Sequence, residues 1–193
     1  MRGAISYFSL TRMFFRHATS LRNVYGVFAR PLFRGEPARC HIEVTGDLRV
    51  EGNVWFAGGG RIRIGRGVRL IGRRAPVELR PHGCGEIILG DGVVIEDGAS
   101  LEATRSILIG QGARIGPFCK IMDNHFHATV GDRFVRPDPV PVSIGQRAVV
   151  GPGAVILPGA DLGADAWLGP HQVLSWRVQA GGEYPSATAE RQS

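Results

Sequence analysis

The chain has 193 residues, of which 44% are hydrophobic and 21% are charged, and it contains 28 glycines. This length and balance predict one folded domain of ordinary size and exclude a disordered chain. The net charge is +6, but residues 1–40 contain seven arginines and one glutamate, whereas the remaining 153 residues contain 16 basic and 16 acidic side chains. The body is therefore neutral, which argues against a nucleic-acid-binding protein.

Residues 1–40 form a basic arm with its own pattern. Within 4–28, large apolar side chains recur at steps of three and four residues, which predicts one or two short amphipathic helices: Tyr7, Leu10, Phe14, Leu21 and Tyr25. Two roles stay open for this arm. It can cap the end of the body, where strand edges would otherwise be unpaired, or it can contact an anionic membrane surface peripherally.

The cellular location follows from what the sequence lacks. No run of 18 apolar residues predicts a membrane span, and the start has no signal-peptide pattern. Cys40, Cys84 and Cys119 form neither a close pair nor a metal-binding spacing, which is typical of a reducing compartment. We expect a cytoplasmic protein, at the inner face of the membrane if the arm binds lipid.

From residue 41 onward the sequence repeats every six residues. Aliphatic side chains occupy every sixth position in the C-terminal half: Ile144, Val150, Ile156, Leu162, Leu168 and Leu174. The same step joins Ile109, Ile115 and Ile121, and the fourth residue after each anchor is usually small or aliphatic. A helix repeats at 3.6 residues and a flat strand at 2, so a period of six with glycines in the turns predicts a parallel β-helix with three sides to each coil.

The repeat breaks at three places. Between Leu101 and Ile109 the step is eight, which predicts a two-residue bulge at a corner. Residues 71–88 are irregular, and we expect them to protrude from the coils. Between Ile121 and Ile144 the step is 23, which predicts a long loop over 122–141. We therefore divide the chain into the cap 1–40, the β-helix 41–175 and a C-terminal tail 176–193.

The loop and the coil that follows it resemble a known family. The return from the loop reads "PVSIG" at 141–145 and continues as "AVVGPGAVILPGADLG". These hexads are similar to those of the hexapeptide-repeat acyltransferases, in particular the galactoside, maltose and polysaccharide O-acetyltransferases. The resemblance implies an all-β, left-handed parallel β-helix that assembles as a homotrimer and acts on a sugar or glycan.

The resemblance also implies which residues act. Counted back from Gly145, the family's catalytic histidine falls at His125, preceded by Asn124, whereas the pattern "D-x-x-F-H" fits Asp123, Phe126 and His127. Both histidines therefore stay candidates for the general base that activates a sugar hydroxyl. Asp123 or a backbone carbonyl would fix the histidine tautomer. Asn124, together with Arg133 and Arg136 in the loop, would bind the acceptor or a coenzyme phosphate.

The acyl donor implied by the resemblance is acetyl-CoA or another short acyl-CoA, used by direct transfer. Its thioester is already activated, so we expect neither a metal nor a covalent intermediate. The coenzyme would lie along Gly151, Pro152, Gly153, Gly169 and Pro170. Here the family offers backbone N–H groups, and this chain has Pro152 and Pro170, which have none. Gly153 is the neighbouring donor that would substitute.

Three hypotheses follow from these patterns. The first is an O-acyltransferase with altered coenzyme contacts. The second is a catalytically degenerate trimer that acts as a scaffold or binding module. The third is an N-acyltransferase that acts on an amino sugar linked to a nucleotide.

Overall fold

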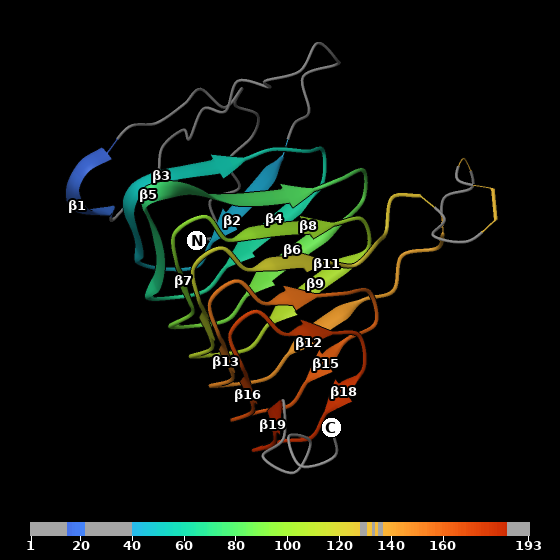
Figure 1. The fold of residues 1–193 in the computed structure, drawn as a ribbon. Helices are drawn as coiled ribbons and strands as arrows, with labels where there is room; N and C mark the ends of the chain where they lie inside the picture. The colour runs from blue at the N-terminus through green and yellow to red at the C-terminus, as the bar shows by residue number, and fades with distance from the viewer. Residues whose placement is uncertain (1–14, 22–39, 128–130, 133, 135–136, 185–193) are drawn as a thin grey trace.

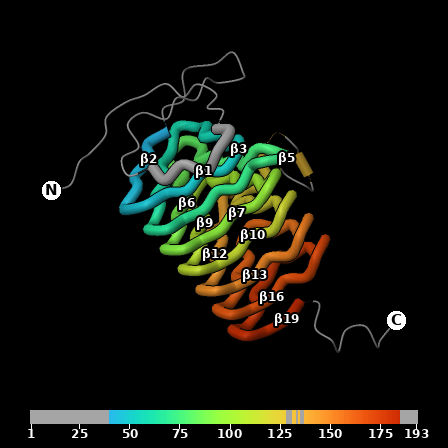
Figure 2. The backbone as a smooth tube through the Cα atoms, turned by 90° about the vertical axis from the view of Figure 1, so that its left-hand side faces the viewer, coloured from blue at the N-terminus to red at the C-terminus, as the bar shows by residue number. Residues whose placement is uncertain are grey.

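The computed structural model describes residues 15–21, 40–127, 131, 132, 134 and 137–184. These residues form a stack of three-sided coils around one axis (Figures 1 and 2). Within these ranges, no helix has the length and apolar character that a membrane crossing demands. The all-β fold predicted from the six-residue period is confirmed.

Each side of the coils is a parallel sheet, and we call the three sides faces A, B and C. Face A contains the second half of β5 (Val68–Pro81) and the strands β8 (Ser100–Ala103), β11 (Lys120–Met122), β14 (Val155–Ile156) and β17 (Val173–Leu174). Face B contains β7 (Val94–Ile95), β10 (Arg114–Ile115), β13 (Val149–Val150), β16 (Trp167–Leu168) and β19 (Glu183–Tyr184). Face C contains β2 (His41–Val44), β4 (Arg61–Ile64), β6 (Glu86–Leu89), β9 (Ser106–Ile109), β12 (Val142–Ile144), β15 (Asp161–Leu162) and β18 (Arg177–Val178).

Two long strands join faces B and A. The strand β3 (Leu48–Phe56) pairs with β5 (Val68–Pro81), and both bend where the register shifts after Gly52. Residues 71–81 therefore belong to the coils, with Val77 and Leu79 fully buried. The prediction that 71–88 protrudes is wrong. At the bend β5 has three more residues than β3, since Gly52 pairs with Gly72 and Val54 with Val77, so the six-residue count is interrupted although the pairing resumes.

The core consists of stacked side chains in register. Ile109, Ile115 and Ile121 are all buried, and each aligns with an aliphatic residue of the neighbouring coil. The small residues four positions after each anchor are buried as well, including Ala113 and Ala148. Burial of roughly 25 cal/mol per Å² of apolar surface, repeated on every coil, is the main stabilising contribution.

The two ends of the chain differ from the prediction. Over Phe15–Leu21 the predicted helix is wrong: these residues form the strand β1, which pairs antiparallel with β3. The physical reason is the edge of the first coil, which offers unpaired backbone groups to any neighbouring strand. The rest of the predicted cap, 1–14 and 22–39, lies outside the described residues. At the other end, β18 and β19 pair with β15 and β16, so the coils extend to Tyr184 and include part of the predicted tail.

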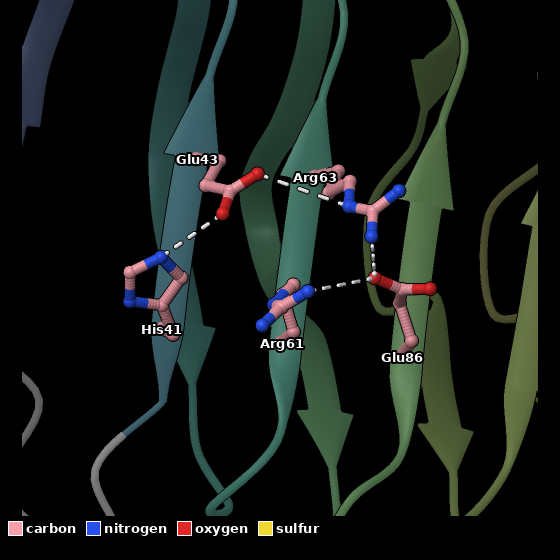
Figure 3. Close-up of polar contacts among 5 residues, drawn as sticks. All are labelled: His41, Glu43, Arg61, Arg63 and Glu86. Atoms are coloured by element: carbon pink, nitrogen blue, oxygen red, sulfur yellow. Dashed lines mark hydrogen bonds and ion pairs between the residues drawn. The ribbon is translucent and has the colours of Figure 1, made fainter. Parts of the chain in front are cut away.

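Charged side chains cross the outer surface of face C in alternation (Figure 3). His41 Nε2 lies 3.1 Å from Glu43 Oε1, and Glu43 Oε2 lies 3.8 Å from Arg63 Nε on the next strand. Arg63 continues to Glu86 at 2.9 Å, and Arg61 reaches the same carboxylate at 4.0 Å. Exposed pairs of this kind contribute at most about 1 kcal/mol each, so they favour one register more than they stabilise the fold.

A second charged cluster lies on the first coils of face B. The carboxylate of Glu51 is nearly buried and contacts Arg69 at 3.1 Å and also Arg73. The hydrogen bond from Arg69 lowers the pKa of Glu51, and Arg73 lowers it further against the opposing effect of burial. This carboxylate is therefore ionised in the folded protein at neutral pH.

Candidate functional site

The long loop leaves the coils at the corner between faces A and C, which we call the AC corner. The strand β11 ends at Met122 and β12 begins at Val142, so the loop lies where the break in the repeat predicted it (Figure 1). Its two ends are tied together, because the Val140 N–H donates to the Asp123 carbonyl at 2.8 Å. The next coil also binds Val140, because the Gly159 N–H donates to the Val140 carbonyl at 3.1 Å.

Asp123 supports the preceding coil. Its carboxylate is fully buried and accepts the backbone N–H groups of Thr104, Arg105 and Ser106 at 2.7, 2.6 and 2.7 Å. These residues lie between Leu101 and Ile109, at the corner where the sequence predicted a two-residue bulge. Three backbone donors occupy the carboxylate, so its observed function is to stabilise the corner, in contrast with the predicted control of a histidine tautomer.

Asn124 fixes the neck of the loop. It is nearly buried, its Nδ2 donates to the Pro137 carbonyl at 3.0 Å, and its Oδ1 accepts the Phe126 N–H. Phe126 adopts a left-handed backbone with φ of 60°, and its N–H takes part in this local side-chain turn. Both ends of the Asn124 amide are therefore used within the loop, and its observed role is to position the backbone.

The two candidate histidines differ in how firmly the chain holds them. His125 is half-buried and lies between Asn124 and Phe126, both of which have fixed contacts. His127 is exposed and is followed by residues 128–130, which lie outside the described part of the chain. Arg133 and Arg136, the predicted acceptor-binding residues, also lie outside it.

Sequence reasoning missed a third histidine, His82, which the structure brings to the same corner. The register Pro81↔Ala103 places His82 beside Thr104, and the register Glu102↔Met122 places Asn124 on the other side of Thr104. The rings of His82 and Phe126 meet edge to face with centroids 5.6 Å apart. The loop therefore reaches back over one coil to a residue that was expected to lie on a protrusion.

His82 also has an acidic neighbour. Its Nε2 lies 3.9 Å from Glu102 Oε2 on β8, which is the distance of an ion pair rather than of a direct hydrogen bond. The pKa of Glu102 lies below its usual value because of His82, with further lowering by Arg80 and Lys120, although burial opposes the shift. A glutamate that stays ionised beside an imidazole is able to orient it.

The predicted coenzyme positions lie at another corner, between faces B and A. Here the Gly151 N–H donates to Leu168 O at 2.7 Å and the Gly169 N–H donates to Tyr184 O at 2.6 Å. The Gly153 N–H donates to Pro117 O at 2.8 Å, so it does not substitute for the donor that Pro152 lacks. Gly153 has φ of 67°, and a Cβ there would collide with the imidazole of His171 on the next coil.

The prolines at this corner have a structural reason. Pro117, Pro152 and Pro170 each precede a residue with positive φ (Phe118, Gly153 and His171), the sequence of conformations that a tight turn after proline favours. Within the described residues, the five predicted positions thus leave no backbone N–H for a coenzyme. Phe118 lies at the same corner, and its side chain is exposed.

Known proteins resemble this chain in part of its sequence and in its fold. No protein-family profile matches the chain. In sequence it is similar to the bifunctional protein GlmU of Bordetella parapertussis and of Bordetella bronchiseptica, at 37% identity over 86 residues. That match covers 44% of the chain and only 18% of each relative. In structure it is similar to AntD, an N-acyltransferase from Bacillus cereus, with a TM-score of 0.58 at 15% identity over 72% of the chain and 75% of AntD.

The buried aliphatic residues at every sixth position and the similarity to AntD together identify the fold. The chain folds as a left-handed β-helix of six-residue repeats. The buried sides of the coils repeat the same six-residue pattern, so the corners are where one coil differs most from the next. The AC corner adds three histidines, a buried amide and an aromatic ring, and is therefore the candidate site.

Proposed function

We propose that the chain is an acyl-CoA-dependent O-acyltransferase that acylates a hydroxyl of a sugar or glycan, with a loop histidine as general base. The observation that carries the proposal is His125, which lies between two anchored residues at the neck of the loop. A sugar hydroxyl is a poor nucleophile near neutral pH, and an imidazole is the side chain that most readily accepts its proton in that range.

The proposed reaction is a direct transfer. The imidazole accepts the hydroxyl proton as the oxygen attacks the thioester carbonyl. The C–S bond then breaks, and the thiolate of coenzyme A takes the proton back from the imidazolium. Because the thioester is already reactive, the chain has to supply only position and one proton acceptor.

The test compares two histidine variants with one control. The release of free coenzyme A from acetyl-CoA is measured with a panel of methyl glycosides and nucleotide sugars as acceptors. We expect His125→Ala to lower kcat by about 10²–10⁴-fold and His127→Ala to lower it far less. His41→Ala, on face C, should leave kcat unchanged. If both loop variants retain full activity, the general-base proposal is refuted.

The assay must take account of the protein's own thiols. Cys84 is exposed, so a thiol reagent would react with the protein as well as with released coenzyme A. A Cys84→Ser background removes this signal. Chromatographic separation of coenzyme A from acetyl-CoA provides an independent measurement.

An N-acyltransferase is the second candidate, because AntD was crystallised with dTDP-4-amino-4,6-dideoxyglucose and coenzyme A. The same panel distinguishes the two if it includes amino sugars and their nucleotide conjugates. A much higher kcat/KM for an amine than for the matching hydroxyl sugar would favour the second candidate. The scaffold hypothesis is favoured by the occupied backbone N–H groups at the coenzyme corner, and calorimetric titration with coenzyme A tests it.

We also propose a homotrimer and a cytoplasmic location. Support for assembly comes from large apolar side chains that stay exposed on the C-terminal coils, namely Val140, Val173 and Trp176. Light scattering coupled to size-exclusion chromatography measures the mass directly. Flotation with anionic liposomes at low and high salt tests whether the basic arm adds membrane contact.

A further inference from the structure

The AC corner contains buried polar atoms without hydrogen-bond partners. Among the described residues, His82 Nε2 and Thr104 Oγ1 are both inaccessible to solvent and have no hydrogen-bond partner, and the only other such side-chain atom is Arg69 Nε on face B. An unsatisfied buried polar group costs about 1–3 kcal/mol, so such groups usually mark a place where a water or a ligand completes the structure. Here two of them occupy adjacent positions of the same corner.

The spacing of the surrounding groups fits a hydroxyl. His82 Nε2 and Glu102 Oε2 are 3.9 Å apart, and an oxygen atom at about 2.8 Å from each would bridge them. A hydroxyl has both capacities that the bridge needs, because it donates to the carboxylate and accepts from the imidazole N–H. Thr104 adds a second donor and acceptor on the neighbouring coil.

An aromatic wall completes the arrangement. Phe126 contacts the ring of His82, and its own side chain is partly exposed at the surface of the corner. Sites for small polar molecules combine an apolar wall with a few placed polar groups, and Phe126 with His82, Glu102 and Thr104 has that composition. Phe126 follows His125 directly in the chain, so both residues belong to the neck of the loop.

We propose that His82 and Thr104 form a subsite for a hydroxyl of the acceptor sugar, with Glu102 as the residue that orients His82 and Phe126 as its apolar wall. The proposal rests on the function proposed above, and it assigns the sugar end of the reaction to the AC corner. It concerns a hydroxyl other than the one that is acylated, because the acylated hydroxyl must reach His125. The ligand class is a pyranose with at least one free hydroxyl besides the one that is acylated.

The first experiment uses Thr104→Val, a change of nearly the same shape. Since the Thr104 hydroxyl has no partner within the described structure, its removal should leave the urea unfolding midpoint unchanged or slightly higher. We expect the KM for the acceptor to rise about tenfold, which corresponds to one lost hydrogen bond, while the KM for acetyl-CoA stays the same. Unfolding therefore cannot explain the expected loss.

The second experiment uses His82→Gln and Glu102→Gln with a matched control. His41 has the same exposed fraction of its side chain as His82, 43%, and it also has a glutamate partner, but it lies on face C. His82→Gln and Glu102→Gln should raise the acceptor KM, and Glu102→Gln should also change the pH profile of acceptor KM. His41→Gln should change neither quantity.

The outcomes separate this proposal from the general function. If Thr104→Val and His82→Gln leave the acceptor KM within twofold while His125→Ala abolishes transfer, the subsite is refuted and the acyltransferase stands. If no transfer is found at all, NMR of the 15N-labelled imidazoles during titration with methyl glucoside, galactoside and mannoside tests the subsite directly. A shift of the His82 ring signal that is lost in Thr104→Val supports it, and a His82 signal unmoved by all three overturns it.

Discussion

Asp123 offers a prediction that distinguishes a structural role from a catalytic one. Its Oδ1 accepts the Thr104 N–H, and its Oδ2 accepts the N–H groups of Arg105 and Ser106. In Asp123→Asn the amide oxygen can keep the pair on one side, but the NH2 group then faces the remaining N–H. One buried donor is left without a partner, and the charge that strengthened the other two bonds is lost.

The expected cost follows from these two losses. An unsatisfied buried donor costs about 1–3 kcal/mol, and hydrogen bonds to a charged acceptor exceed neutral ones by up to about 1.5 kcal/mol. Because such contributions are not additive, we expect Asp123→Asn to lower the free energy of unfolding by about 2–3 kcal/mol. Urea denaturation followed by far-ultraviolet circular dichroism measures this quantity.

Asp97 is the matched control. It follows β7 and binds the backbone in the bend of β5, where its Oδ1 alone accepts both the Arg74 N–H at 2.6 Å and the Ala75 N–H at 3.5 Å. Asparagine can place its oxygen in the same position, so Asp97→Asn should cost less than about 1 kcal/mol. Equal costs for the two variants would refute the reasoning. A fully stable Asp123→Asn without activity would show instead that the carboxylate acts on a histidine.

Three further predictions rest on other parts of the chain. The lowered pKa of Glu51 means that its contribution to stability is present above the ordinary pKa of about 4.3 and is lost as pH falls through the folded value, so Glu51→Gln should flatten the acid limb of the unfolding midpoint. Gly153→Ala should destabilise the fold by about 1–2 kcal/mol more than Gly181→Ala, because both residues have φ of 67° but only the first would meet a side chain; equal thermal midpoints would contradict this. A thiol reagent should modify the exposed Cys84 quickly and Cys119 only after unfolding, because burial raises the pKa of the Cys119 thiol to about 11; mass spectrometry of the modified peptides measures the order.

The six-residue period was sufficient to predict the core. Ile144, Val150 and Ile156 are six residues apart in the sequence, and all three are buried in the structure. Each side of a coil buries one such side chain, so the pattern of the core repeats along the chain. The loop was equally visible, since an insertion is the only way to lengthen one step from 6 to 23 residues. The shorter break in β5 was misread: its three extra residues form a bend within a paired strand, whereas the sequence predicted a protrusion.

The sequence by itself thus determined the β-helix, its register and the position of the loop with its two histidines. Only the tertiary structure decided which residues meet at the AC corner, because neighbours there lie about twenty residues apart and belong to successive coils. In the folded chain His82 contacts Phe126, and the Asp123 carboxylate binds the backbone of the previous coil. The backbone N–H groups at the predicted coenzyme positions form hydrogen bonds between coils. The period specifies what points inward, whereas the chemistry depends on which outward side chains the stacking of coils places side by side.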